Sequence, residues 1–352
     1  MKVICVVGAR PQFVKLAPLL PGLQEKYETL IVHSGQHYDD PLSACFFRDL
    51  KLPQPDYNIG AGSGKHGLQT AKILIRIEEI CEFEKPDMVI VFGDTNTTLA
   101  GALAASKLKF RIAHVEAGMR SFVRAMPEEI NRVLTDHLSD ILFCSTETAV
   151  ANLKNEGIVN GVHLVGDLMY DALRIFEGHA GLKSSVLKNI GLSAGEYILV
   201  TIHRAENTDD HDRLRFLIDG IKNINREIVF PVHPRTEKEL KNADLWMELK
   251  SKENMHLVEP VGYLDNIALV RNAFMVLTDS GGMQKETYYF GTPTITLRDE
   301  TEWVETVDAG INVLLGKRGL DEVIEDMSRK TFETPNIENS AAARIIEVLD
   351  NG

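Results

Sequence analysis

Short apolar runs alternate with longer amphipathic segments along the whole chain. Most of the runs are continuously apolar and rich in β-branched residues, as in strands that are buried on both faces. Six of them lie in the first half of the chain, at Val3–Val7, Thr29–Val32, Met88–Phe92, Arg111–Val115, Ile141–Cys144 and Val162–Val165. Six more lie in the second half, at Ile198–Ile202, Ile228–Val232, Met255–Val258, Met275–Thr278, Thr294–Leu297 and Ile311–Leu315. The segments that predict helices include Gly67–Phe83, Thr97–Lys107, Glu128–His137, Thr146–Glu156 and Asp210–Ile224.

Alternation of strands and helices predicts parallel sheets covered by helices, which is an α/β fold. A polar and less regular stretch at 177–196 separates the two sets of strands. We therefore expect two Rossmann-like, doubly wound domains at 1–170 and 171–335, with a C-terminal helix within 336–352 that packs back on the first domain. Doubly wound domains bind ligands at the carboxyl ends of their strands, so the expected site is a central cleft that the two sets of strand ends face.

The composition is that of an ordinary folded chain with an acidic balance. Its 352 residues include 51 acidic and 38 basic side chains, for a net charge of −13. Such a chain repels nucleic acid and anionic membranes unless it carries a basic patch, and no run of Lys and Arg is long enough to form one. We expect neither kind of partner. An anionic substrate would need a few well-placed cations.

Cysteine usage and the N-terminal sequence indicate a cytoplasmic protein. The four cysteines, Cys5, Cys45, Cys81 and Cys144, are far apart and include no C-x-x-C pair. This spacing argues against a disulfide framework or a zinc site and fits a reducing compartment. The first apolar run is too short for a signal peptide, and no later run could span a bilayer.

Candidate anion-binding residues follow the first strand. Gly8-Ala9-Arg10-Pro11-Gln12 opens a helix, with Lys15 one turn further on. A helix N-terminus offers free N–H groups to an anion, and Arg10 and Lys15 would add full charges. A surface turn with two solvated cations is the alternative.

Two acids follow the third and fourth strands. Asp94 lies in Gly93-Asp94-Thr95-Asn96, and Glu116 ends the next strand. If these strands are neighbours, the two carboxylates lie close together, which is costly as pure structure because like charges repel. Asp94 alone would be explained as a helix cap. Together the two acids favour a functional site.

A third acid begins the next predicted helix. In Pro127-Glu128-Glu129-Ile130-Asn131-Arg132, Glu128 and Arg132 are four residues apart and share one helix face. The segment is either a capped helix with an exposed ion pair or a catalytic acid oriented by an arginine.

Polar residues also follow strands of the second domain. His203 and Arg204 follow one strand, and His233 follows another. A histidine can donate to a phosphate or transfer a proton near neutral pH, although a single histidine is more often structural. Two at strand ends of one domain favour function.

The strongest single signal is Ser280-Gly281-Gly282, followed by Glu286. Glycines between a strand and a helix allow the backbone to approach a diphosphate, which then meets the helix N-terminus. Glu286 lies about one turn further on, where its carboxylate could accept both ribose hydroxyls. A plain tight turn does not account for this acid.

Taken in order, these motifs resemble the non-hydrolysing UDP-N-acetylglucosamine 2-epimerases, from Gly8-Ala9-Arg10-Pro11 through His203-Arg204-Ala205-Glu206-Asn207 to Ser280-Gly281-Gly282. The resemblance covers nearly the whole chain. It implies a glycosyltransferase-B architecture, a homodimer, no dissociable cofactor and no metal. It also implies interconversion of UDP-GlcNAc and UDP-ManNAc.

The resemblance assigns roles residue by residue. The family's catalytic set matches Asp94, Glu116, Glu128, Arg132 and His203, and its UDP-binding set matches Arg10, Lys15, Ser280, Gly281, Gly282 and Glu286. His233 is a further candidate for substrate binding. Bacterial relatives bind a second UDP-GlcNAc as an activator, and Gln36 and Arg204 are candidates for part of such a site.

The sequence departs from the family pattern after Thr301-Glu302. Some members have Arg-Pro there, whereas this chain has Trp303-Val304, so a ligand contact by that arginine side chain is not available.

The chemistry that the resemblance implies is elimination and re-addition of UDP. The C2 hydrogen of the sugar is not acidic, so the C1–O bond breaks first or concurrently and UDP leaves. Loss of the C2 proton gives 2-acetamidoglucal. UDP then adds back while a proton arrives at the other face of C2, which requires acid–base groups on both faces. Asp94, Glu116 and Glu128 are the candidates.

Three alternatives share much of this pattern. A hydrolysing epimerase would release UDP and free ManNAc. A glycosyltransferase-B-type transferase would need an acceptor site and fewer acids. A nucleotide-sugar sensor would bind without chemistry, and the complete acid set argues against it.

Overall fold

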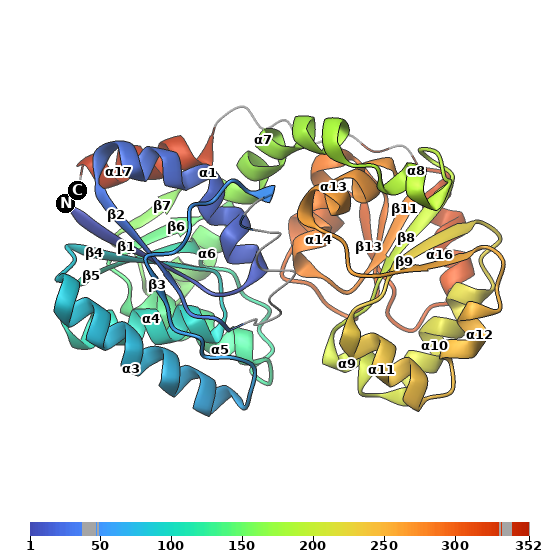
Figure 1. Cartoon of the computed structure of the whole chain (residues 1–352), viewed down its shortest axis with the longest axis horizontal. Helices are drawn as coiled ribbons and strands as arrows, with labels where there is room; N and C mark the ends of the chain where they lie inside the picture. The colour runs from blue at the N-terminus through green and yellow to red at the C-terminus, as the bar shows by residue number, and fades with distance from the viewer. Residues whose placement is uncertain (37–46, 48, 331, 333–339, 352) are drawn as a thin grey trace. The chain divides into compact units, whose positions relative to one another are not determined.

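The computed structural model describes residues 1–36, 47, 49–330, 332 and 340–351. The chain forms two compact units (Figure 1). Unit 1 comprises Met1–Ile175 and Ile337–Gly352, and unit 2 comprises Phe176–Asn336. The boundary falls inside helix α7 (Leu168–Lys183).

Unit 1 is built on a parallel sheet of seven strands in the order β3-β2-β1-β4-β5-β6-β7. Their bounds are β1 Lys2–Val7, β2 Glu28–His33, β3 Tyr57–Asn58, β4 Met88–Phe92, β5 Arg111–Ala117, β6 Ile141–Cys144 and β7 Val162–Leu164. The order reverses between β1 and β4, so the carboxyl ends of these two strands flank the switch point, where doubly wound sheets bind ligands. Every residue of β4 is buried, because helices cover both faces of the sheet.

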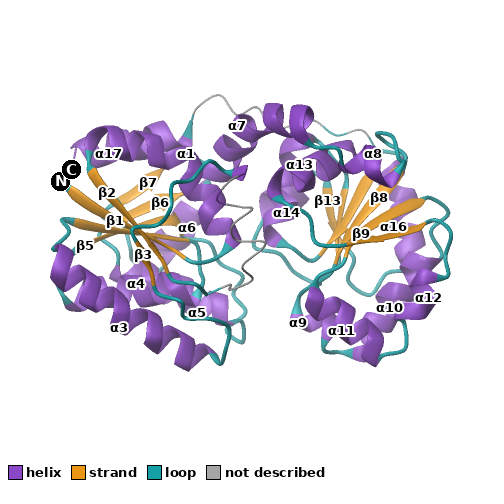
Figure 2. Ribbon diagram, viewed as in Figure 1, coloured by secondary structure: helices purple, strands orange, loops and turns teal. Residues whose placement is uncertain are grey.

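The helices of unit 1 pack on the two faces of this sheet (Figure 2). They are α1 Arg10–Lys26, α3 His66–Glu84, α4 Asn96–Lys107, α5 Pro127–Leu138, α6 Glu147–Asn155, part of α7, and α17 Ala341–Asn351. Ile73 and Ile77 of α3 share a buried core with small residues of α4 and with strand residues such as Val91. A Cβ on Gly101 of α4 would lie 3.0 Å from Cγ1 of Val91, so this glycine lets the helix approach the sheet closely.

The C-terminal helix α17 packs against α1. Ile345 and Ile346 of α17 are buried, and a Cβ on Gly22 of α1 would lie 2.9 Å from Cγ1 of Ile346. At the end of the same pair of helices, Asp350 accepts hydrogen bonds from Lys26 and Tyr27. The last segment of the chain therefore belongs to the same unit as the first.

Unit 2 is built on a parallel sheet of six strands in the order β10-β9-β8-β11-β12-β13. Their bounds are β8 Tyr197–Thr201, β9 Glu227–Pro231, β10 Met255–Val258, β11 Met275–Thr278, β12 Thr294–Thr296 and β13 Asn312–Leu314. The remaining helices are α8 Val186–Ile190, α9 Ala205–Thr208, α10 His211–Lys222, α11 Pro234–Asn242, α12 Trp246–Lys250, α13 Tyr263–Asn272, α14 Gly281–Phe290, α15 Val304–Asp308 and α16 Leu320–Ser328. Here the order reverses between β8 and β11, whose carboxyl ends flank the second switch point.

The prediction of two doubly wound α/β domains is confirmed, with two local differences. The edge strand β3 was not predicted, because two residues give no apolar run. The stretch 177–196 is less irregular than predicted, since it holds the end of α7 and all of α8. Leu173, Phe176 and Ala180 form the buried face of α7. The polar residues between them obscure this helical spacing in the sequence.

The cysteines that the structure describes are thiols in the core. Cys5, Cys81 and Cys144 are buried and free, and burial raises the pKa of each to about 12. Cys45 lies outside the described residues. Among the helices described, none is both long and apolar enough to cross a lipid bilayer.

Candidate functional site

The carboxyl ends of β4 and β5 carry the two acids that the sequence singled out. The strands are direct neighbours, and the amide of Gly93 donates to the carbonyl of Val115 at 2.9 Å beyond the last ladder pair. Gly93 has a φ of 62°, the left-handed region that favours glycine, and this turns the chain into Asp94. Asp94 and Glu116 therefore stand on adjacent strand ends, as the sequence predicted.

Glu116 has a strained backbone. Its φ is 69°, which is uncommon for a residue with a side chain, and the register with β6 shifts between Val115 and Ala117. Such a bulge re-aims the side chain at a cost of about 1–3 kcal/mol, and strain of this kind is concentrated at functional sites. Lys15 of α1 lies with its Nζ 2.5 Å from Oε1 of Glu116, and both side chains are nearly buried. The pair joins the end of β5 to the first helix.

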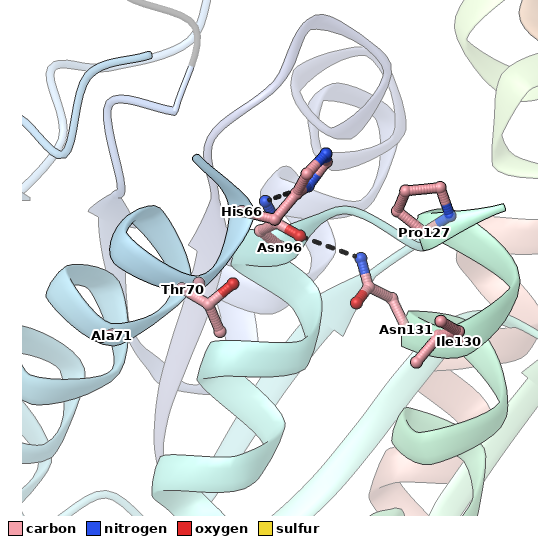
Figure 3. Close-up of a pocket in the computed structure, with 8 residues that line it drawn as sticks. His66, Thr70, Ala71, Asn96, Pro127, Ile130 and Asn131 are labelled. Carbon is pink, nitrogen blue, oxygen red and sulfur yellow. Dashed lines mark hydrogen bonds between the residues drawn. The ribbon is translucent and has the colours of Figure 1, made fainter. Parts of the chain in front are cut away.

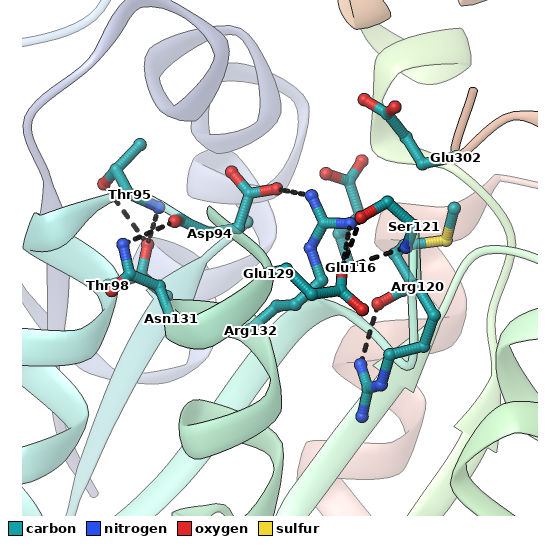
Figure 4. A network of polar contacts seen from close by, with 12 residues as sticks. Asp94, Thr95, Thr98, Glu116, Arg120, Ser121, Glu129, Asn131, Arg132 and Glu302 are labelled. Carbon is teal, nitrogen blue, oxygen red and sulfur yellow. Dashed lines mark hydrogen bonds and ion pairs between the residues drawn. The ribbon is translucent and has the colours of Figure 1, made fainter. Parts of the chain in front are cut away.

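Arg132 of α5 brings a second cation to the same edge. It donates to Asp94 and, through Nη1 at 3.1 Å, to Oε2 of Glu129 (Figure 4). Glu129 also accepts from the amides of Ser121 and Phe122, at 2.9 and 3.0 Å. A buried carboxylate with these partners fixes both the arginine and the loop before α5.

The predicted pairing of Glu128 with Arg132 is not what the structure shows. The arginine pairs with Glu129, three residues before it, while Glu128 is half-buried and has no hydrogen-bond or ion-pair partner in the described part of the chain. Helix periodicity allows both the i,i+3 and the i,i+4 pair, so the spacing could not choose between them. Glu128 is thus near the cluster in sequence without being oriented by Arg132.

A buried network of hydrogen bonds and ion pairs holds the backbone around Glu116. His114 of β5 places Nδ1 2.7 Å from Oδ1 of Asp136 and Nε2 2.7 Å from the carbonyl of Gly93. Both ring nitrogens thus lie within hydrogen-bond distance of oxygen atoms, which fixes the orientation of the ring. Asp136 also accepts from the amide of Gly118 at 3.1 Å and from Arg120 at 2.7 Å. One carboxylate of α5 thereby holds the chain on both sides of Glu116.

The turn after β1 is held by Gln12. Its side-chain oxygen accepts from the amides of Gly8 and Ala9, at 2.7 and 3.0 Å, and its amide donates to the carbonyl of Phe92 at 2.7 Å. A Cβ on Gly8 would lie 1.8 Å from Oγ of Ser34, so only glycine fits there. Arg10, the first residue of α1, is exposed next to this turn.

Gln36 caps α4. Its side-chain oxygen accepts from the amide of Thr97 at 3.0 Å and from the hydroxyl of Thr97 at 2.7 Å. The sequence suggested Gln36 for an activator site. In this structure its side-chain oxygen accepts hydrogen bonds at the N-terminus of α4.

A cavity of about 410 Å³ opens between α3 and α5 at the start of α4. Figure 3 shows the hydrogen-bonded chain in its wall, in which Asn96 joins His66 to Asn131. Asn131 also donates to the carbonyl of Asp94 at 3.0 Å. The cavity wall is thus connected to the backbone of a candidate catalytic acid.

In unit 2, Asp279 organises the ends of β8 and β11. It is completely buried and accepts from the amides of His203 and Arg204, at 3.0 and 2.9 Å, and from Asn207 at 3.1 Å. Its Oδ1 lies 3.1 Å from Nδ1 of His203. Burial acts to raise the pKa of Asp279, but these partners outweigh burial and hold the pKa below its ordinary value. The imidazole of His203 is therefore fixed by one nitrogen while the side chain stays partly exposed.

The remaining predicted residues of unit 2 lie around the same edge. Ser280 is the N-cap of α14 and accepts from the amide of Met283, with Gly281 and Gly282 in the first turn. Glu286, one turn on, is buried and accepts from Asn266 at 2.9 Å. His233 caps α11, and its ring centroid lies 6.0 Å from that of His203. Arg204 has Nη2 3.9 Å from Oε1 of Glu302.

Comparison with known proteins places this arrangement in a family. The sequence model of a family described as UDP-N-acetylglucosamine 2-epimerase matches residues 23–350. The chain belongs to this family. A UDP-N-acetylglucosamine 2-epimerase homolog of Methanococcus maripaludis is 51% identical over 360 residues, with all of both chains covered. A UDP-2,3-diacetamido-2,3-dideoxy-D-glucuronate 2-epimerase of Pseudomonas aeruginosa is 47% identical over 368 residues, with 99% of both covered.

A solved structure of the UDP-N-acetylglucosamine 2-epimerase family agrees closely with the whole chain. The crystal structure of Methanocaldococcus jannaschii UDP-GlcNAc 2-epimerase, in complex with UDP-GlcNAc and UDP, gives a TM-score of 0.93 at 44% identity, with all of both chains covered. The fold is accordingly of the glycosyltransferase-B type that the family resemblance implied.

Sequence reasoning missed the buried residues that hold the candidates in place, namely Glu129, Asp136, His114 and Arg120 in unit 1 and Asp279 in unit 2. Asp279 had a usable signal, because it directly follows a strand next to the one that ends before His203. Asp136 had none, since an acid in the last turn of an amphipathic helix predicts a solvated position.

Asp136 gives a prediction about acid stability. Burial acts to raise its pKa, but the hydrogen bonds and charges of His114 and Arg120 outweigh burial and hold the pKa below its ordinary value. A depressed carboxyl pKa stabilises the fold fully above the unfolded-state pKa of about 4, and this contribution is lost as the pH falls below it. We expect Asp136→Asn to lower the free energy of unfolding at pH 7 by about 3 kcal/mol, because it breaks a buried charge network.

The measurement is urea unfolding followed by circular dichroism at pH 7, 5 and 3. The difference between wild type and Asp136→Asn should shrink at the lowest pH. Glu25→Gln, which removes an exposed carboxylate of α1, is the control and should change little at any pH. A difference that stays constant from pH 7 to pH 3 would contradict the role of the ionised carboxylate.

Proposed function

We propose that this protein is a non-hydrolysing UDP-N-acetylglucosamine 2-epimerase that interconverts UDP-GlcNAc and UDP-ManNAc. One observation carries the proposal: two acids on adjacent strand ends of unit 1 are each paired with a nearly buried cation, Asp94 with Arg132 and Glu116 with Lys15. A binding module or a simple transferase does not require two such acids. Family membership and the bound ligands of the Methanocaldococcus jannaschii structure support the choice of substrate.

The reaction begins with departure of UDP. The C1–O bond breaks and its electron pair leaves with UDP, while a base removes the C2 proton and a C1=C2 double bond forms. Growing charge on the diphosphate needs donors that are already in place. In unit 2 these are the first turn of α14 and His203, which Asp279 orients. We propose that Arg10 and Lys15 of unit 1 are further cations that bind the anionic substrate.

The second half-reaction restores the bond on the inverted sugar. UDP attacks C1 of 2-acetamidoglucal, and a proton is delivered to the face of C2 opposite the one that lost it. Asp94, Glu116 and Glu128 supply the acid and the base. The cations beside Asp94 and Glu116 offset the negative charge of these two carboxylates during the cycle. The strained backbone of Glu116 directs its side chain for this purpose.

The test of this scheme is turnover in deuterated water. With UDP-GlcNAc as substrate, we expect deuterium at C2 of the UDP-ManNAc formed, because the departing and arriving protons exchange with solvent through the acids. Proton NMR of the anomeric region measures conversion and label together. Epimerisation without label would remove the proton-transfer scheme, and accumulation of UDP with free ManNAc would make the protein a hydrolysing epimerase.

The sugar itself is tested in the same assay. The Pseudomonas aeruginosa relative is nearly as similar in sequence and is named for a diacetamido glucuronate, so overall identity does not separate the two sugars. We expect UDP-GlcNAc to be turned over faster than UDP-2,3-diacetamido-2,3-dideoxy-D-glucuronate at equal concentration. The reverse order would reassign the substrate while leaving the epimerase chemistry intact.

Glu116→Gln separates catalysis from binding. The amide keeps the shape of the side chain but cannot take up a proton, so kcat should fall by about 10²–10⁴-fold, the usual contribution of one acid–base group. UDP binding, measured by calorimetry, should stay within a few-fold of wild type. Equal loss of UDP binding and activity would make Glu116 a structural residue.

We also propose that two copies of the chain form a homodimer through α3 and α5. Leu68 and Ile75 of α3 are 59% and 55% exposed, and Ile130 and Leu134 of α5 are 50% and 47% exposed. Both helices pack on α4 and line the same cavity, so these side chains belong to one face of unit 1. Large apolar side chains gathered on one face are typical of interaction sites. A reducing, cytoplasmic location is proposed with it, and the buried free thiols support this.

Light scattering coupled to size exclusion tests the dimer. The double variant Ile75→Asp, Leu134→Asp places charge on the shared face and should convert a dimer of about twice the 39.3 kDa chain mass into a monomer. Met247→Asp, which changes an exposed apolar side chain of unit 2, should leave the dimer intact. A dimer that survives the double variant would place the interface elsewhere.

A further inference from the structure

Phe122 has a strained backbone conformation. Its φ is 62°, in the left-handed region that favours glycine, and this is a genuine outlier for a bulky side chain. Apart from Glu116, the other described non-glycine residues with a positive φ lie at helix ends or in a closed turn, where this conformation is ordinary. They are Lys51, Lys85, Lys109 and Asp244. Glu116 and Phe122 have no such explanation, and both lie between the end of β5 and the start of α5.

The loop that carries Phe122 is held by hydrogen bonds. The amides of Ser121 and Phe122 donate to the carboxylate of Glu129, at 2.9 and 3.0 Å. The amide of Val123 donates to the hydroxyl oxygen of Ser121 at 3.3 Å, and the amide of Met126 donates to the carbonyl of Val123 at 2.9 Å. The surrounding structure therefore imposes the strained conformation, as it does where strain is part of a functional site.

The same carboxylate connects this loop to a candidate catalytic acid. Glu129 accepts from Arg132 at 3.1 Å, and Arg132 in turn donates to Asp94 (Figure 4). Only two side chains thus separate the backbone amide of Phe122 from the carboxylate of Asp94. The network that orients Asp94 also positions Phe122, at the edge of the sheet where a sugar must lie for these acids to act on it.

The ring of Phe122 is exposed although its backbone is fixed. The residue is 73% exposed. A single exposed apolar side chain is normal on a protein surface. Here, however, the backbone is strained in order to hold a ring that buries little apolar surface, so burial of the ring does not offset the strain. Strain that packing leaves uncompensated is typical of residues that contact a ligand.

The proposed chemistry requires an apolar contact with the sugar. When the C1–O bond breaks, the sugar becomes 2-acetamidoglucal, which carries no charge and is no longer joined to the diphosphate. The groups that bind UDP therefore cannot hold the sugar. Its acetamido methyl and its C–H groups remain available to an aromatic ring, and small-molecule sites are commonly lined by such rings.

We propose that the ring of Phe122 packs against the sugar of the bound substrate and retains the neutral intermediate until UDP adds back. Phe122 is a substrate-contact residue, and its left-handed backbone, fixed by Glu129, directs the ring toward the sugar. This inference rests on the proposed function, because that function supplies an intermediate that must be retained.

The products released by Phe122→Ala test this contact. With UDP-GlcNAc as substrate, ion-exchange chromatography measures free UDP and proton NMR measures free 2-acetamidoglucal, each relative to the UDP-ManNAc formed. Loss of contact with one large apolar side chain corresponds to roughly 10- to 100-fold in affinity. We expect the ratio of released to retained intermediate to rise by about that factor, with equal amounts of UDP and 2-acetamidoglucal released. The value of kcat/KM should fall by a similar factor.

Binding of UDP alone separates the sugar contact from a general loss of structure. UDP lacks the sugar, so calorimetry should give the same Kd for UDP in Phe122→Ala as in wild type. Phe122→Tyr keeps the ring and should retain the intermediate as wild type does. Phe83→Ala is the matched control, because Phe83 is another exposed phenylalanine of unit 1, at 79%. This control should change neither retention nor kcat/KM.

Phe122→Gly separates retention from stability. Glycine adopts the left-handed region without steric cost, whereas alanine does not. Phe122→Gly should therefore unfold at a higher temperature than Phe122→Ala and yet release the intermediate to the same extent. It also replaces Phe122→Ala in every measurement if the alanine variant does not fold.

Three outcomes would overturn the proposal. The first is wild-type retention and kcat/KM in the alanine and glycine variants. The second is a Kd for UDP that rises together with the loss of activity, since Phe122 would then only support the fold. The third is dissociation of a dimer by Phe122→Ala in size exclusion, which would assign the ring to a contact between copies of the chain.

Failure of the proposed function is distinguishable from failure of this inference. If the wild type turns over no UDP-sugar, the proposed function fails. Calorimetry with UDP-GlcNAc then still measures the sugar contact, which predicts weaker binding to Phe122→Ala and unchanged binding of UDP. If the wild type epimerises UDP-GlcNAc and the variants release no intermediate, the function stands and the inference about Phe122 fails.

Discussion

Two carboxylates at neighbouring strand ends repel each other, and a cation beside each of them offsets that repulsion. In this protein Lys15 approaches Glu116 from α1, and Arg132 approaches Asp94 from α5. The two helices are thus required at this edge for electrostatic reasons as well as for covering the sheet.

In each unit a buried aspartate holds the residues at the strand ends in position. Asp136 holds the chain on either side of Glu116, and Asp279 holds the backbone and ring of His203. Each accepts several N–H groups, and each has a depressed pKa despite burial. Neither needs to contact a ligand to matter, because both fix side chains that stand at the strand ends.

The sequence was sufficient to predict the architecture because buried parallel strands produce continuous apolar runs. Runs such as Met88–Phe92 are apolar throughout, and the motifs that follow them stand at strand ends by necessity. The two-residue strand β3 is too short to produce such a run. Side-chain pairing was harder, since helical spacing permits Arg132 to meet either Glu128 or Glu129 and only the packed loop before α5 decides. The contact of Lys285 with the ring of Trp303 joins residues eighteen positions apart, and no local pattern connects them.

The left-handed backbone of Glu116 lowers the folding stability of the protein but keeps a carboxylate at this position. Glycine adopts this conformation without steric cost, so a chain selected for stability alone would carry glycine there and lose the carboxylate. Keeping glutamate means that the protein folds slightly less well than its own backbone allows. If Glu116 has the proposed role, function opposes neutral drift toward the more stable residue at this position.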